Sequence, residues 1–511
     1  MNRGTCRRRD FTPLLPSLAS AISLARAFSA PILLAGVLLG CSNFHHRAYR
    51  LEHPQLQDPE SKFVLNFVEA DDEGWFWDPS QAKAALQTVK DSADSRDTIV
   101  LVYAHGWHHS AACCDDNVEG FKEVLKRLHD ELGSTMFRTA REQVHAITGA
   151  TNQYRVVGIY IGWRGGSLPG VLDYLSFWGR KSAAKRVGET DLSEFMQRLR
   201  MMYDEHNAPR RADGAPPAKT YLGLVTVGHS FGSQVVIRAV SQNLEQRLEN
   251  LGAAATFLRQ TDTPPAVALN APARGYGDLI LLINPAVEAA AYERLRTLSQ
   301  RFSYTQQQTP LILTLSADND RPRHKLFQWG REVGEFFTAT PYKADPRERG
   351  MERQALGFYD GPGPQETHRL TPVDGNVKLV STSVPRTPEP YCDHAGHCNC
   401  QFFVWATPPT ITKPDALPSD VDVGQNPKLK DLISKYDFSS STIFGNVLLD
   451  PHAGGVPYQP MILASVDKKI IDGHNGMFSQ PLLDFLTKYI GFIEAKRYLI
   501  TASEKQWMTP P

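Results

Sequence analysis

The stretch that decides the fold is YLGLVTVGHSFGSQVVIRAV, residues 221–240. Its first half is an apolar run of strand-forming residues, and its second half carries Val236 and Val240 at helical spacing. Between the halves stands Ser230, with a glycine two positions before it and another two positions after it. This G-x-S-x-G pattern predicts a sharp turn from a buried strand into a helix, with the serine at the turn. Glycines suit such a turn because the strand and the helix backbones pass closely.

A serine at this junction is a candidate nucleophile. Serine is also a favoured helix N-cap, so the motif needs support from the rest of the chain. A serine hydroxyl is a weak nucleophile, and it needs a histidine as general base and an acid that orients the histidine. Where G-x-S-x-G is catalytic, the partners follow along the chain in the order serine, acid, histidine.

The chain supplies both partners in that order. Residues 311–315 have the character of a buried strand, and Asp318 and Asp320 follow it. Residues 461–466 form the last predicted strand, and His474 follows them in DGHNGMF. The choice of acid stays open, because Asp318 fits a D-x-x-x-P arrangement and Asp320 belongs to an Asn-Asp pair. We therefore predict a triad of Ser230, His474 and one of the two aspartates.

Further apolar runs predict the rest of the sheet. Residues 99–103, 156–161 and 279–283 are continuous apolar segments bounded by polar residues, which indicates buried parallel strands. Helical spacing follows several of them, for example over 118–132. Alternating strands and helices predict an α/β fold, with a mostly parallel central sheet covered by helices on both faces.

The loop sequence YAHGW, residues 103–107, offers the last element that the chemistry needs. An acyl-transfer site stabilises the oxyanion of its tetrahedral intermediate with two preorganised donors. We expect the amide of Phe231, directly after the serine, and the amide of Trp107 to be these donors. The histidines of the neighbouring HGWHH lack the spacing of a metallohydrolase, so we predict no metal and no cofactor.

Composition narrows the class of protein. The chain has 511 residues, of which 41% are hydrophobic, which is enough for a large core. Lys and Arg total 55, as do Asp and Glu, so the formal net charge is zero. A nucleic-acid-binding protein is usually basic, and we therefore expect no nucleic-acid partner.

The N-terminus resembles a bacterial export signal. Three arginines, residues 7–9, precede a 14-residue apolar stretch at 27–40, and Cys41 follows it. Such a stretch is short for a membrane span, and its end resembles a lipobox. We expect Cys41 to be lipidated and to anchor an exported lipoprotein in the bacterial envelope, facing the periplasm or the outer membrane. An uncleaved membrane anchor is the alternative.

The sequence YCDHAGHCNC holds three further cysteines. In an oxidising compartment this pattern predicts a disulfide, either Cys392–Cys398 or Cys392–Cys400. A zinc site that includes His394 and His397 is the alternative, although the spacing matches no standard zinc finger.

These signals divide the chain into five parts. Residues 1–41 form the signal peptide or anchor, and 42–95 an N-terminal extension. Residues 96–330 form the α/β core, which 460–511 complete with the predicted base. Residues 331–459, rich in Pro and Gly and containing the cysteine cluster, form an insertion or cap.

Several of these segments together resemble the α/β-hydrolase superfamily, and within it a branch of bacterial and fungal esterase- and lipase-like proteins. The resemblance rests on AHGWHHSA, DDNVEGF, GIYIGWRGGS, FWGRKSAAKRVG, GHSFGSQVV, LLINPAVEA and DGHNGMF. It implies an α/β-hydrolase fold and a serine hydrolase that cleaves carboxylic esters through an acyl-enzyme, without a cofactor. It implies no particular substrate. Two alternatives stay open, namely a surface-anchored binding protein without turnover and a metal-dependent hydrolase.

Overall fold

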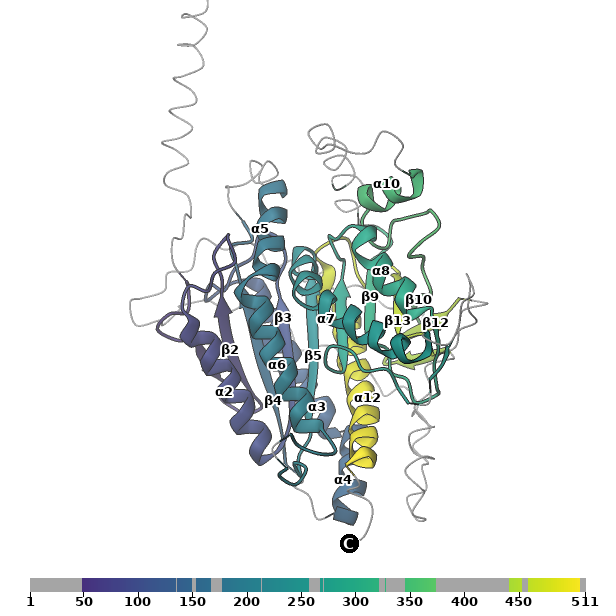
Figure 1. Cartoon of the computed structure of the whole chain (residues 1–511). Helices are drawn as coiled ribbons and strands as arrows, with labels where there is room; N and C mark the ends of the chain where they lie inside the picture. The colour runs from purple at the N-terminus through teal and green to yellow at the C-terminus, as the bar shows by residue number, and fades with distance from the viewer. Residues whose placement is uncertain are drawn as a thin grey trace, which may run out of the picture. The chain divides into compact units, whose positions relative to one another are not determined.

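The predicted strands and helices assemble around one large sheet in the computed structural model (Figure 1). The structure describes residues 48–134, 136–148, 153–166, 177–212, 214–256, 267–269, 271–320, 327, 345–373, 441–452 and 458–505. All of these residues belong to one compact unit.

The sheet has 11 strands in the order β1-β2-β4-β3-β5-β7-β9-β13-β10-β12-β11. From β2 to β10 neighbouring strands run parallel, whereas β1 at one edge and β12 and β11 at the other run antiparallel to their neighbours. The mostly parallel α/β sheet predicted from the sequence is thus confirmed. In sheet order the strands are β1 (Gln55–Gln57), β2 (Phe63–Glu69), β4 (Tyr154–Gly162), β3 (Asp97–Ala104), β5 (Leu222–His229), β7 (Leu279–Ile283), β9 (Ile312–Ala317), β13 (Met461–Val466), β10 (His368–Pro372), β12 (Val447–Pro451) and β11 (Thr442–Phe444). A separate pair joins β6 (Val267–Ala268) and β8 (Phe302–Ser303).

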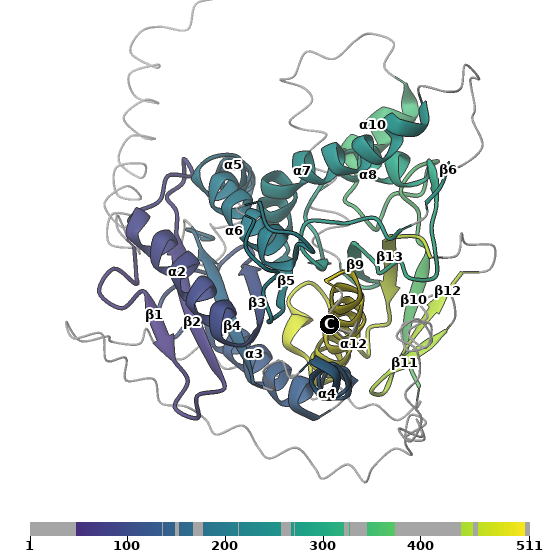
Figure 2. The same ribbon diagram turned by 60° about the horizontal axis from the view of Figure 1, so that its bottom comes forward.

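Helices cover both faces of this sheet, as Figure 2 shows. Alternate side chains of β3 explain why its whole run is apolar: Leu101 packs into one core and Val102 into the other. The first core is closed by α3 (Asp116–Ser134), α4 (Met136–Thr148) and α12 (Gln480–Glu504). The second core is closed by α2 (Pro79–Ser95), α5 (Phe177–Glu189), α6 (Asp191–Asn207), α7 (Phe231–Thr256) and α8 (Ala289–Ser299). Helix α10 (Pro346–Arg353) packs near α8, and a short 3₁₀ helix, η3 (Gly476–Phe478), precedes α12.

The sheet extends beyond the predicted core at both edges. Strands β1 and β2 and helix α2 come from residues 42–95, the predicted N-terminal extension. Strands β10, β11 and β12 come from residues 331–459, the predicted insertion. The final helix, α12, is buried on several sides, and its apolar residues are therefore not confined to one stripe.

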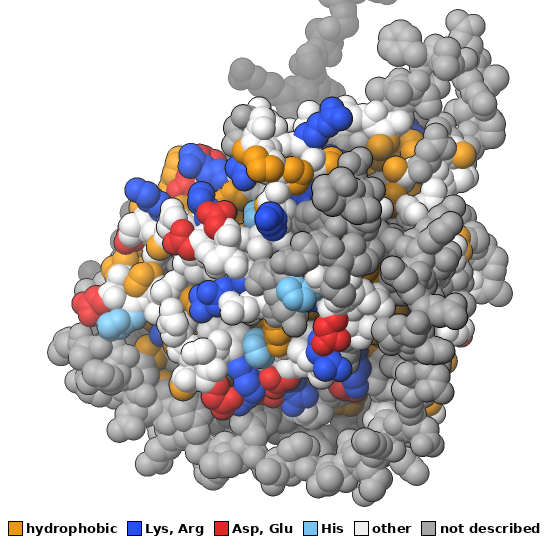
Figure 3. Space-filling view, turned by 90° about the horizontal axis from the view of Figure 1, so that it is seen from below, with side chains coloured by type: hydrophobic (Ala, Val, Ile, Leu, Met, Phe, Trp, Pro, Cys, Tyr) orange, Lys and Arg blue, Asp and Glu red, His pale blue; other side chains and the backbone are white. Residues whose placement is uncertain are grey.

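The charged surface agrees with the balanced composition. On the face drawn in Figure 3, basic and acidic side chains of the described residues are interspersed and no field of one sign dominates. Across the described part of the chain, no helix combines the length and the hydropathy that crossing a membrane requires.

Candidate active site

The serine of the opening motif stands where β5 passes into α7. Ser230 has φ 54°, in the left-handed region that non-glycine residues seldom adopt. Three backbone hydrogen bonds hold it there: its N–H donates to Ile283 O at 3.0 Å, and its carbonyl accepts from the N–H groups of Ser233 and Ala286, both at 3.1 Å. Such a conformation persists only where its surroundings enforce it, and it is typical of functional sites.

Close packing explains the glycines of the motif. A Cβ atom on Gly232 would lie 2.0 Å from Ala104 O, and one on Gly228 would lie 2.7 Å from Gly232 O. Both distances are impossible for real side chains, so the turn requires glycine at these two positions.

Three segments far apart in the sequence meet at this turn. His474 Nε2 lies 2.6 Å from Ser230 Oγ, and His474 Nδ1 lies 2.7 Å from Asp320 Oδ2. Ser230 and Asp320 are almost fully buried, with 2% and 1% of their surface exposed. Because the carboxylate accepts a hydrogen bond from the Nδ1–H group, Nε2 is left with a lone pair that faces the serine hydroxyl. This arrangement lets the imidazole take a proton from Ser230 while Asp320 holds its orientation.

Asp318, the alternative acid, lies elsewhere. Its Oδ2 is 3.2 Å from the Arg369 guanidinium, and its side chain is 39% exposed. Partial burial raises the pKa of Asp318, an effect that Arg369 opposes. The geometry therefore brings Asp320 to the histidine and leaves Asp318 in an ion pair at the surface.

The loop after β3 passes directly over the serine. A Cβ atom on Gly106 would lie 2.8 Å from Ser230 Cβ, so the backbone at this point lies against the serine. Trp107 follows, and Phe231 is the first residue of α7, where amides have no intrahelical acceptor. The rings of both residues pack on Phe177, with centroids 5.1 Å and 4.8 Å away, respectively. One aromatic cluster thus fixes the two residues whose amides we expected to serve as oxyanion donors.

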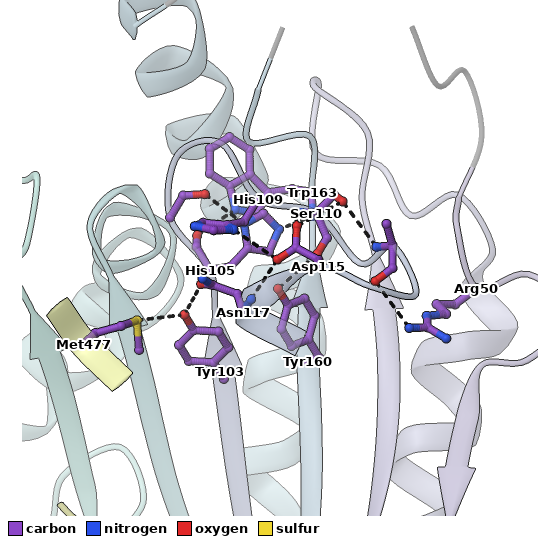
Figure 4. A network of polar contacts seen from close by, with 12 residues as sticks. Arg50, Tyr103, His105, His109, Ser110, Asp115, Asn117, Tyr160, Trp163 and Met477 are labelled. Carbon is purple, nitrogen blue, oxygen red and sulfur yellow. Dashed lines mark hydrogen bonds and ion pairs between the residues drawn. The ribbon is translucent and has the colours of Figure 1, made fainter. Parts of the chain in front are cut away.

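A network of polar contacts holds the loop that follows β3 in place (Figure 4). Asp115 accepts hydrogen bonds from the N–H groups of Ser110 and Asn117 at 2.8 Å and 2.9 Å, and it also contacts His109 Nδ1 at 3.0 Å. Burial would raise the pKa of Asp115, but His109 and these donors together hold it below its usual value. The ionised carboxylate of Asp115 therefore joins residues of this loop that lie up to six positions apart in the sequence.

His105 belongs to the same support. Its Nε2 accepts the Trp163 N–H at 3.1 Å, its carbonyl accepts the Trp163 indole N–H at 3.1 Å, and the two rings stack 5.4 Å apart. Burial lowers the pKa of His105 to about 4, so the ring is neutral at pH 7. Trp163 is therefore a buried residue that holds His105 in place through two hydrogen bonds and a ring stack.

Among the residues that the structure describes, no three His, Cys, Asp or Glu side chains lie close enough together to form a metal site. The predicted lipidation site Cys41 and the predicted disulfide cysteines Cys392, Cys398 and Cys400 lie outside the described residues. Cys113 and Cys114, which follow the HGWHH histidines, are both disulfide-bonded.

Sequence reasoning missed the residues that hold the histidine loop. His229, the residue before the serine in the motif, has its Nε2 3.0 Å from the His474 carbonyl oxygen. Burial and, to a smaller extent, the neighbouring His474 lower the pKa of His229 to about 3, so His229 is a neutral donor at pH 7. Asn284 and Asn319 also bond this loop. The only sequence signals were an asparagine after a predicted strand and the Asn-Asp pair.

Comparisons of the chain with models of protein families, with curated proteins and with solved structures gave no match.

Proposed function

We propose that this protein is a serine hydrolase of the α/β-hydrolase fold that cleaves carboxylic esters through an acyl-enzyme. The observation that carries the proposal is the pair of short contacts at His474, 2.6 Å to Ser230 Oγ and 2.7 Å to Asp320 Oδ2. A strained serine at a strand-to-helix turn, with a histidine and a buried carboxylate in line, is the arrangement that activates a serine hydroxyl.

In the proposed mechanism, Ser230 Oγ attacks the ester carbonyl carbon while His474 Nε2 takes the hydroxyl proton. Asp320 stabilises the imidazolium that results. The amides of Trp107 and Phe231 donate to the oxyanion of the tetrahedral intermediate, and each such donor is worth about 3 kcal/mol of transition-state stabilisation. When the intermediate collapses, the C–O bond to the leaving group breaks and His474 returns its proton to the departing alkoxide.

The second half of the reaction repeats these steps with water. His474 deprotonates a water molecule, the hydroxide attacks the acyl-Ser230 carbonyl, and the second intermediate releases the carboxylic acid as Ser230 recovers its proton. The net reaction converts an ester and water into an acid and an alcohol. It needs no metal and no cofactor.

A fluorophosphonate probe tests the proposal, because it phosphonylates only an activated serine. We expect the wild-type protein to be labelled and Ser230→Ala to be unlabelled, and we expect the wild type alone to hydrolyse a chain-length series of nitrophenyl esters. No labelling of the wild type would indicate a binding protein that lacks turnover. Ester hydrolysis that survives in Ser230→Ala but is abolished by EDTA would indicate a metal-dependent hydrolase instead.

Membrane attachment is a separate part of the proposal. The lipobox-like end of the N-terminal stretch supports lipidation of Cys41 in a bacterial envelope. Cys41→Ser should be exported but should no longer partition with membranes. Unchanged partition would favour an uncleaved anchor.

A further inference from the structure

Asn284 occupies a position that joins the three segments of the triad. It follows β7, is fully buried, and has φ 45°, a left-handed conformation that asparagine adopts more readily than most residues. Neither its burial nor its strained backbone is needed to end a strand. Its contacts explain both.

The first set of contacts ties Asn284 to the strand that leads to Asp320. Its N–H donates to Leu315 O at 2.8 Å, and its Oδ1 accepts the Ala317 N–H at 2.9 Å. The carbonyl of Ala317 in turn accepts the Asp320 N–H at 3.2 Å. The side chain of Asn284 is therefore fixed to the backbone that delivers the acid.

The second set ties it to the histidine loop. Asn284 Nδ2 donates to Gly473 O at 3.1 Å and to His474 O at 2.9 Å. An amide NH₂ has two protons and here meets two carbonyls, while Oδ1 meets an N–H, so the hydrogen-bonding pattern settles the orientation of the amide. Every polar atom of this buried side chain is used.

The third set reaches the nucleophile through the residues that flank Asn284. Ile283 O accepts the Ser230 N–H, and the Ala286 N–H donates to Ser230 O. One short turn, residues 283–286, is thus bonded to the backbone of the serine, to the strand before the acid and to the histidine itself.

We propose that Asn284 is the positioning residue that sets the His474 imidazole between Ser230 and Asp320, acting through the backbone carbonyls of the histidine loop. The inference rests on the proposed function and specifies how its triad is held. His474 makes contacts of 2.6 Å and 2.7 Å on opposite sides of its ring, so a shift of the loop breaks at least one of them. His229 Nε2 and Asn319 Oδ1 bond the same loop, and Asn319 directly precedes Asp320. Asn284 differs from both because its two side-chain nitrogen contacts hold the carbonyls of Gly473 and His474 while its Oδ1 holds the end of β9.

Asn284→Asp is the most direct test. Aspartate keeps the shape, tolerates the left-handed conformation and preserves the acceptor for Ala317, but it sets an oxygen against two carbonyl oxygens. We expect the rate constant for fluorophosphonate labelling to fall about 100-fold, the loss that a misplacement of about 1 Å causes. Asn284→Gly, which fits φ 45° without strain and removes the amide altogether, should show a fall of similar size.

Asn207→Asp is the matched control. Asn207 is a buried asparagine, with 3% of its surface exposed. Its side-chain amide forms hydrogen bonds with the N–H and the carbonyl of Leu222, at the end of β5 opposite to Ser230. Asn207→Asp should lower the melting temperature about as much as Asn284→Asp does. It should leave the labelling rate of the folded protein unchanged.

A spectroscopic readout separates this inference from the proposed function. The Nδ1 proton shared by His474 and Asp320 should give a low-field ¹H NMR signal, identified by its loss in His474→Ala. We expect this signal to persist in Asn207→Asp and to be lost or shifted in both Asn284 variants. Wild-type protein that shows the signal but no labelling would overturn the proposed function alone. Folded Asn284 variants with wild-type labelling and an unchanged signal would overturn the role of Asn284.

Discussion

Asp320 contacts His474 and Asp318 contacts Arg369, and the substitutions Asp320→Asn and Asp318→Asn test which of the two serves as the acid. In Asp320→Asn the isosteric amide can turn an N–H toward His474 Nδ1, which then has to accept rather than donate. The proton of the neutral imidazole moves to Nε2, and the lone pair that faced Ser230 Oγ at 2.6 Å is lost. His474 can then no longer take the serine proton.

The magnitude follows from the burial of the pair. The Asp320 side chain is 0% exposed and lies 2.7 Å from Nδ1, so no water can take over its role. Removal of the orienting carboxylate while the geometry is kept costs about 10⁴-fold in rate in serine hydrolases with such a triad. This loss corresponds to about 5 kcal/mol of transition-state stabilisation.

Asp318→Asn is the matched comparison. Its half-exposed ion pair with Arg369 belongs to the class worth about 0–1 kcal/mol of stability, and none of it bears on His474. The assay is the rate constant of fluorophosphonate labelling for both variants, with thermal unfolding as a check of the fold. We expect a loss of about 10⁴-fold for Asp320→Asn and none for Asp318→Asn. Equal losses, or a larger loss in Asp318→Asn, would refute the assignment.

Two further predictions concern the loop over the serine and the buried histidines. Gly106→Ala would place a Cβ atom 2.8 Å from Ser230 Cβ, so the rate of fluorophosphonate labelling should fall about 100-fold. Gly179→Ala is the control, because a Cβ atom there meets nothing within 4 Å, and its labelling rate should equal that of the wild type. Burial lowers the pKa of His105 to about 4 and that of His229 to about 3, against 6.5 when unfolded. The unfolded chain therefore takes up protons first as the pH falls, and stability should decrease from pH 6.5 downward, by about 3 kcal/mol at pH 4 for His105 alone. Urea unfolding at pH 7 and pH 4.5 measures this slope, and an equal free energy of unfolding at both pH values would contradict it.

The local pattern of the sequence was enough to locate most of the central strands. Strands β7 and β13 have the predicted bounds, and β5 lies in the apolar half of residues 221–240, as predicted. Their continuous apolar runs have one physical cause, burial on both faces of a parallel sheet. The outer strands were less visible, because β1, β10 and β11 are short and partly exposed and carry no such run.

The sequence also determined the order of the candidate site. A serine between glycines, two aspartates after one strand and a histidine after the last strand are local features. Parallel strands place their carboxyl ends at one edge of the sheet. From this rule Ser230, His474 and the pair Asp318 and Asp320 could be expected to meet.

Only the tertiary structure decided which atoms touch. Asp318 and Asp320 are two residues apart, and no local rule turns one toward His474 and the other toward Arg369. The choice depends on the path of the chain after β9 and on the position of β10, which enters the sheet from a distant part of the sequence. The role of Asn284 was hidden for the same reason, since its partners in the histidine loop are 189 and 190 residues away. Composition and periodicity report which residues are buried, whereas hydrogen bonds between distant backbones exist only once the sheet has brought its strand ends together.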